Sequence, residues 1–107
     1  MFNEFEETTA RRIDICLKEV GKLPAVNRII VFGSRIKGNS REDSDLDVAV
    51  FFDLDESKML ECYRKLVKIC AIPEVDIQIQ AFPAEELKNP SGIVGEIVNE
   101  GVIYHCP

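Results

Sequence analysis

The chain of 107 residues has no apolar run near the roughly 20 residues that a membrane-spanning helix needs. Its first residues, MFNEFEETTARR, are charged and helix-forming, unlike a secretory signal. These two absences lead us to expect a protein of the cytoplasm. A hydrophobic content of 46% and a charged content of 30% are typical of one soluble globular domain, which we expect to span residues 1–107.

Basic residues are too few for a broad nucleic-acid surface. The chain has 13 Lys and Arg against 19 Asp and Glu, which gives a net charge of −6. Nonspecific binding to nucleic acid needs clustered Lys and Arg side chains that neutralise phosphates. We therefore expect no general nucleic-acid partner, while a tRNA 3′ end as a substrate stays open.

The residue spacing typical of structural zinc sites is absent as well. The four cysteines, Cys16, Cys62, Cys70 and Cys106, form no CxxC pair, and His105 is the one histidine. Structural zinc sites use Cys and His ligands at short, fixed spacings, so the sequence predicts no such site. Three of the cysteines lie in helix-like segments and are expected in or near the core.

Hydrophobic periodicity predicts an α/β (α+β) fold, with a small mixed sheet and helices packed on one face. Helices are expected over residues 4–20, from Asp55 or Ser57 to Pro73, and from Ser91 to Gly101. Strands are expected over residues 27–32, 47–52, 75–82 and 102–105, the last as a short edge strand. The long connection before the third strand allows it to lie beside the second.

The third expected strand is polar on one face. Asp76, Gln78 and Gln80 alternate there with apolar residues, which is the period of a strand covered on one side. Asp76 comes at the start of the strand. One face of the sheet is therefore available for a site.

The most informative segment is residues 28–52, RIIVFGSRIKGNSREDSDLDVAVFF. An apolar strand leads to Gly33 and Ser34, and after ten further residues Asp45 and Asp47 open the next strand. Residues two apart on an extended chain have side chains on the same face of a sheet. Backbone N–H groups exposed after a strand can hold phosphate. A phosphate cradle facing two carboxylates indicates magnesium and a nucleoside triphosphate.

Each of these residues also has a plainer interpretation. Gly33 and Ser34 alone fit a helix N-cap that follows a strand. Asp45 and Asp47 alone fit a solvated turn leading into a strand, and Asp76 alone fits a surface aspartate. The combination of all of them favours the phosphate and metal interpretation.

Two loop residues near the motif remain open between a ligand role and a structural one. Arg35 can neutralise triphosphate charge or simply be a solvated loop charge. Ser44 can contact the nucleotide or orient the loop by bonding the backbone.

With Gly-Ser, ten residues and Asp-x-Asp, the segment resembles the signature of the DNA polymerase beta-type nucleotidyltransferases. The short chain is most similar to their minimal members, the MNT antitoxins. The resemblance implies a polymerase beta-like nucleotidyltransferase fold. It implies catalytic and metal-ligating roles for Asp45, Asp47 and Asp76. It implies nucleotide contacts from Gly33, Ser34, Arg35 and Ser44.

By the same resemblance, Asp45 and Asp47 ligate two Mg²⁺ ions, with Mn²⁺ as the alternative metal. Asp76 ligates the catalytic ion and helps to deprotonate the acceptor hydroxyl. In two-metal phosphoryl chemistry, one ion activates the attacking oxygen and the other steadies the leaving pyrophosphate.

The resemblance also implies a reaction and a partner. The expected activity transfers AMP from ATP to a tyrosine hydroxyl of a helical HEPN-type toxin, a ribonuclease, and releases pyrophosphate. The residues themselves favour only magnesium-dependent nucleotidyl transfer. A noncatalytic antitoxin-like docking module and a small-molecule nucleotidyltransferase stay open as alternatives, although the length leaves no room for an acceptor-binding domain. Homo- and hetero-oligomers both remain open.

Overall fold

The computed structural model describes residue 2 and residues 5–33, 46–53 and 55–106. Its elements are α1 (Glu7–Gly21), β1 (Val26–Phe32), β2 (Leu46–Phe52), α3 (Glu56–Ile69), β3 (Ile77–Pro83), the 3₁₀ helix η1 (Ala84–Leu87), α4 (Gly92–Glu100) and β4 (Val102–His105). No helix within the described ranges is both long enough and apolar enough to cross a membrane.

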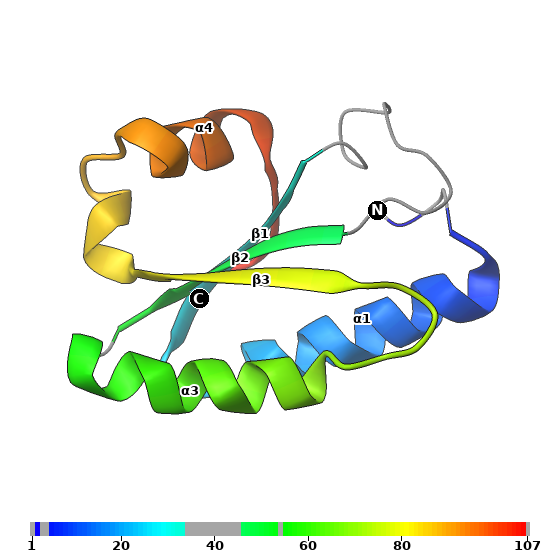
Figure 1. Cartoon of the computed structure of the whole chain (residues 1–107). Helices are drawn as coiled ribbons and strands as arrows, with labels where there is room; N and C mark the ends of the chain where they lie inside the picture. The colour runs from blue at the N-terminus through cyan, green and yellow to red at the C-terminus, as the bar shows by residue number, and fades with distance from the viewer. Residues whose placement is uncertain (1, 3–4, 34–45, 54, 107) are drawn as a thin grey trace.

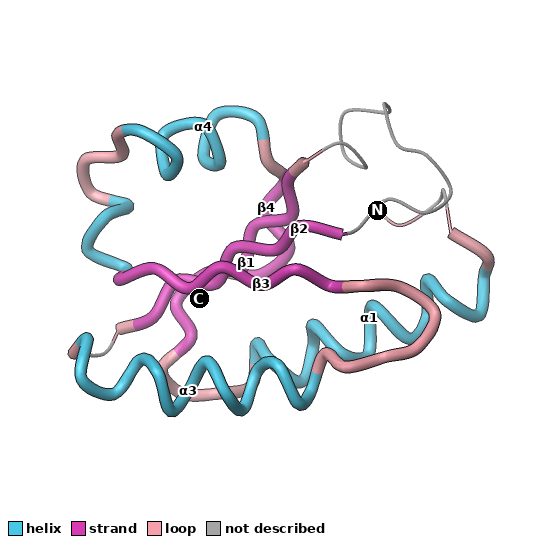
Figure 2. Tube along the Cα trace, in the orientation of Figure 1, coloured by secondary structure: helices cyan, strands magenta, loops and turns pink. Residues whose placement is uncertain are grey.

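The four strands form one mixed sheet in the order β3-β2-β1-β4 (Figure 2). β1 runs antiparallel to both β2 and β4, whereas β2 and β3 are parallel. The crossover through α3 is what allows two consecutive strands to run in the same direction. The mixed sheet, the position of the third strand beside the second and the edge strand 102–105 are confirmed.

Helices α1 and α3 cover one face of the sheet (Figure 1). The periodicity of α1 places four apolar side chains on one stripe, and all four are buried: Ile13, Cys16, Leu17 and Val20. They pack with the alternate strand residues Ile29, Val31, Val48 and Val50, which are also fully buried. This cluster is the larger part of the core.

Helix α4 requires a correction to the prediction that helices pack on one face. It lies with η1 on the face opposite α1 and α3 (Figure 1), where Val94 and Ile97 are buried. These side chains join a second cluster with Ile30 and Phe51 from the strands. The physical reason is that β1 and β2 are apolar on both faces, and each apolar face must be covered.

The predicted boundaries shift by a few residues. The first helix spans Glu7–Gly21, α3 ends at Ile69 before Pro73, and β3 begins at Ile77. The helix η1 was not predicted, because its four residues are too few to show a hydrophobic period.

Gly101, between α4 and β4, occupies a position where no side chain fits. A Cβ there would lie 2.5 Å from Ile30 Cγ2 and 2.6 Å from the carbonyl oxygen of Ile97. That carbonyl already accepts a hydrogen bond from the Gly101 N–H at 2.8 Å, so moving it aside would cost free energy. We expect Gly101→Ala to lower the free energy of unfolding by about 1–3 kcal/mol, measured by urea denaturation.

Gly95→Ala is the matched control, because a Cβ at Gly95 would lie 3.7 Å from the backbone of Pro90, an ordinary van der Waals distance. This helix-interior change should leave the stability unchanged or raise it by about 0.5–1 kcal/mol. Equal effects of the two substitutions would contradict the close packing at Gly101.

Candidate active site

Asp47 is the second residue of β2, and Gly33, the residue that follows β1, packs against it. Phe32 pairs with Asp47 across the antiparallel ladder, which brings the next residue, Gly33, beside the carboxylate. A Cβ on Gly33 would collide with Asp47 Oδ2 and lie 3.1 Å from Asp47 Cγ. Gly33 also has a φ of +92°, which favours glycine. The backbone therefore approaches this carboxylate at a distance that no other residue type permits.

Asp76 is placed at the same end of the sheet by the parallel pairing of β2 and β3. It is an exposed residue immediately before β3, and its carbonyl accepts a hydrogen bond from Leu46 N–H at 3.0 Å. Asp47 pairs with Gln78, and Asp76 is two residues before Gln78 on the extended chain. Since alternate residues share a face, Asp47 and Asp76 lie on the same face of neighbouring strands.

Gln78 bonds directly to the Asp76 side chain. Its Nε2 donates to Asp76 Oδ2 at 2.7 Å. The sequence placed Gln78 on the polar face of the strand but did not predict this hydrogen bond. The signal was the separation of two residues on a strand, which brings side chains of one face near each other.

The face that carries Asp47 changes from polar to apolar along the strands. Gln78 and Gln80 are exposed on β3 near its start. Towards the other end, the rings of Phe51 and Phe82 stack with centroids 5.4 Å apart, and α4 and η1 cover them. The sheet thus keeps only the polar end of this face uncovered by these helices, whereas the alternation in β3 predicted that the whole face was available.

Four of the predicted site residues, Ser34, Arg35, Ser44 and Asp45, lie outside the described residues. In the part of the chain that the structure describes, no group of three or more His, Cys, Asp or Glu side chains is arranged to hold a metal ion. The described residues contribute two carboxylates to this end of the sheet, Asp47 and Asp76. Their oxygen atoms are of the ligand type that Mg²⁺ and Mn²⁺ prefer.

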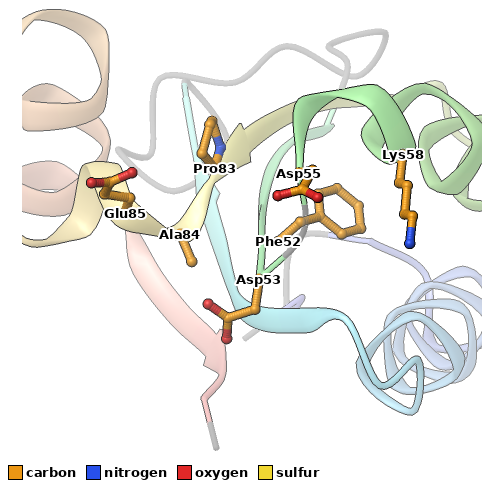
Figure 3. Close-up of a pocket in the computed structure, with 7 residues that line it drawn as sticks. All are labelled: Phe52, Asp53, Asp55, Lys58, Pro83, Ala84 and Glu85. Atoms are coloured by element: carbon orange, nitrogen blue, oxygen red, sulfur yellow. The ribbon is translucent and has the colours of Figure 1, made fainter.

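A separate pocket of about 400 Å³ lies at the opposite ends of β2 and β3 (Figure 3). Its lining combines the acidic side chains of Asp53, Asp55 and Glu85 with Lys58. Six residue steps along β2 separate Asp53 from Asp47, which corresponds to about 20 Å on an extended strand. None of the predicted site residues lines this pocket.

Tyr104 of β4 is half-buried and has a structural role. Its hydroxyl lies 3.0 Å from the carbonyl oxygen of Asp14 and also bonds the Asp14 side chain. Burial, together with that hydrogen bond, raises the pKa of Tyr104, while the same hydrogen bond lowers the pKa of Asp14. The contact ties β4 to α1 and lies on the sheet face opposite Asp47.

The sheet packs Gly33 against Asp47 and places Asp76 on the same face just before the neighbouring parallel strand, an arrangement that fits a nucleotidyltransferase domain. Comparison with known families agrees with this class. Residues 12–106 match the family described as Polymerase beta, Nucleotidyltransferase, and the chain belongs to that family.

Solved structures with the same fold include a candidate nucleotidyltransferase from Sulfolobus solfataricus. It has a TM-score of 0.64 and 16% identity, with 88% of this chain and 77% of that chain covered. A toxin–antitoxin with AMP-PNP has a TM-score of 0.54 and 23% identity over 91% of this chain and 73% of that chain. A mutant of the toxin–antitoxin MntA-HpeT has a TM-score of 0.52 and 23% identity, covering 92% and 72%. No curated protein matches this chain.

Proposed function

We propose that this protein transfers AMP from ATP to a tyrosine hydroxyl of a HEPN-type toxin and releases pyrophosphate. The observation that carries the proposal is the close packing of the Gly33 turn against Asp47, with Asp76 on the same face. Because Gly33 has no side chain, phosphate can approach backbone N–H groups beside Asp47 and Asp76.

Each candidate site residue has a distinct role in this reaction. Asp47, together with Asp45, is suited to hold two Mg²⁺ ions, and Gly33 with Ser34 is suited to contact the triphosphate. Arg35 and Ser44 are further candidates for nucleotide contact. Mg²⁺, when bound, neutralises the charge that develops on the triphosphate.

Asp76 is suited to accept the proton of the acceptor hydroxyl. The hydroxyl oxygen then forms a bond to the α-phosphorus of ATP, and the bond from that phosphorus to the bridging oxygen breaks. Pyrophosphate leaves with the electron pair, and AMP remains on the acceptor. Direct in-line transfer of this kind requires no covalent intermediate on the enzyme.

The proposed acceptor is supported by the similar solved structures. They include toxin–antitoxin pairs, one of which holds AMP-PNP, an analogue of ATP.

The proposal can be tested with labelled ATP in a lysate of the source cell that contains the partner. ATP carries the label on either the α or the γ phosphate, and Asp47→Asn protein serves as the control. Alpha label on one protein band, absent with the control, is the expected result. Gamma label alone would indicate a kinase-like activity instead. No label from either position would favour a docking module that neutralises its partner without catalysis.

Asp76→Asn should separate binding from turnover. We expect this variant to retain Mg²⁺–ATP binding, measured with a fluorescent ATP analogue, and to transfer AMP about 10²–10⁴-fold more slowly, as is typical when a general base is lost. Asp55→Asn is the control, because Asp55 is an exposed acid before α3 whose side chain makes no capping hydrogen bond. Full activity of the Asp76 variant would remove Asp76 from the mechanism.

A further inference from the structure

We propose that Gln78 is a positioning residue, which holds the Asp76 carboxylate in the orientation that metal binding and proton transfer require. This inference rests on the proposed function of the same site. It concerns a residue that makes its contact through Asp76 and needs no contact of its own with ATP or the acceptor.

The backbone of Asp76 is held, but its side chain has little packing around it. Asp76 precedes β3 by one residue, and the Leu46 N–H to Asp76 carbonyl hydrogen bond at 3.0 Å ties it to β2. The residue is exposed. An exposed aspartate side chain exchanges among rotamers, and fixing it in one rotamer when a ligand binds costs entropy.

The hydrogen bond from Gln78 restricts this freedom. Gln78 Nε2 donates to Asp76 Oδ2 at 2.7 Å. Because an ionised carboxylate only accepts hydrogen bonds, the amide nitrogen of Gln78 must face it. Within the described part of the chain, Asp76 Oδ1 makes no hydrogen bond. One oxygen is thus fixed by Gln78, and the other remains accessible to a metal ion or an acceptor proton.

Gln78 is itself placed by the sheet. It lies inside β3, directly opposite Asp47 in the parallel register, so its side chain and that of Asp47 share a face. A side chain on a paired strand is positioned more precisely than a side chain on a loop. Gln78 therefore connects the strand scaffold to Asp76, which itself lies just before the strand begins.

Gln80 provides a matched control from the same strand. It is a second exposed glutamine on the same face, two residues further along and opposite Ala49. Replacing either glutamine by methionine keeps the length and the unbranched shape of the side chain but removes the amide. Only Gln78→Met removes the donor to Asp76.

The experiment compares wild-type protein, Gln78→Met and Gln80→Met. Binding of Mn²⁺ alone is measured by electron paramagnetic resonance, AMP transfer gives kcat and the KM for ATP, and thermal melting checks the fold. Loss of an interaction that orients a metal ligand typically costs 10–100-fold in metal affinity or activity. We expect Gln78→Met to weaken Mn²⁺ binding about 10–100-fold and to lower kcat similarly, with little change in the KM for ATP. Gln80→Met should match wild type in all three measurements.

The possible failures are distinguishable. If Gln78→Met and Gln80→Met behave alike in Mn²⁺ binding and in kcat, the positioning role of Gln78 is wrong, whereas the proposed function stands if both transfer AMP. If wild type binds Mn²⁺ and only Gln78→Met weakens that binding, the positioning role stands even when no AMP transfer is found. Wild-type protein that neither binds Mn²⁺ nor transfers AMP would overturn both proposals.

Discussion

Asp47→Asn should reduce the rate of AMP transfer by about 10³-fold or more and leave the fold intact. Charge stabilisation by a bound metal is worth several kcal/mol in the transition state, and each 1.36 kcal/mol corresponds to about a tenfold change in rate. Asparagine keeps the shape of aspartate but removes its negative charge. The packing of the Gly33 turn against this side chain is therefore largely retained. Single-turnover transfer with α-labelled ATP measures the effect.

Asp53→Asn is the control for this variant, because Asp53 directly follows the other end of β2. It accepts a hydrogen bond from Asn27 at 2.9 Å and lies about 20 Å from Asp47 along the extended strand. Its substitution should leave the transfer rate near that of wild type. A large fall in the melting temperature of Asp47→Asn would instead recast Asp47 as a structural residue.

Gly33→Ala is expected to affect both stability and activity. A Cβ at this position collides with the Asp47 carboxylate, and the φ of +92° is strained for any L side chain. A left-handed backbone conformation costs about 1–2 kcal/mol for a residue with a Cβ, which urea denaturation can measure. Displacement of Asp47 adds a loss of activity, about 10²-fold when a reacting group shifts by about 1 Å.

Gly92→Ala separates the two effects. Gly92 also has a positive φ, +55°, but a Cβ there would meet no atom within 4 Å. We expect a comparable loss of stability of about 1–2 kcal/mol with no loss of AMP transfer. Equal activity of the two alanine variants would show that the contact between Gly33 and Asp47 has no role in the reaction.

Much of this architecture could be predicted from the sequence because its patterns are local. The period of α1 identified its buried stripe, and the alternation in β3 identified the exposed face with Gln78 and Gln80. The predicted start of the third strand located Asp76 at one end of the sheet, and the predicted end of the first strand located Gly33. Each of these features follows from how neighbouring residues along one strand or helix are spaced.

Other features depend on contacts between distant segments, which spacing does not encode. The apolar sequence of α4 predicts a helix, but its place on the second face follows from how β1 and β2 are covered. The collision of a Cβ at Gly33 with Asp47 depends on the register of β1 with β2. The ligand roles of Ser34, Arg35, Ser44 and Asp45 stay predictions, since these residues lie outside the described ranges.

The most direct test of the proposed site is a crystal structure of the protein with Mn²⁺ and AMP-PNP, using the anomalous signal of manganese. We expect manganese density against the carboxylates of Asp47 and Asp76, with the triphosphate beside Gly33. Manganese and nucleotide bound instead in the pocket near Asp53, with nothing at Asp47, would contradict the assignment.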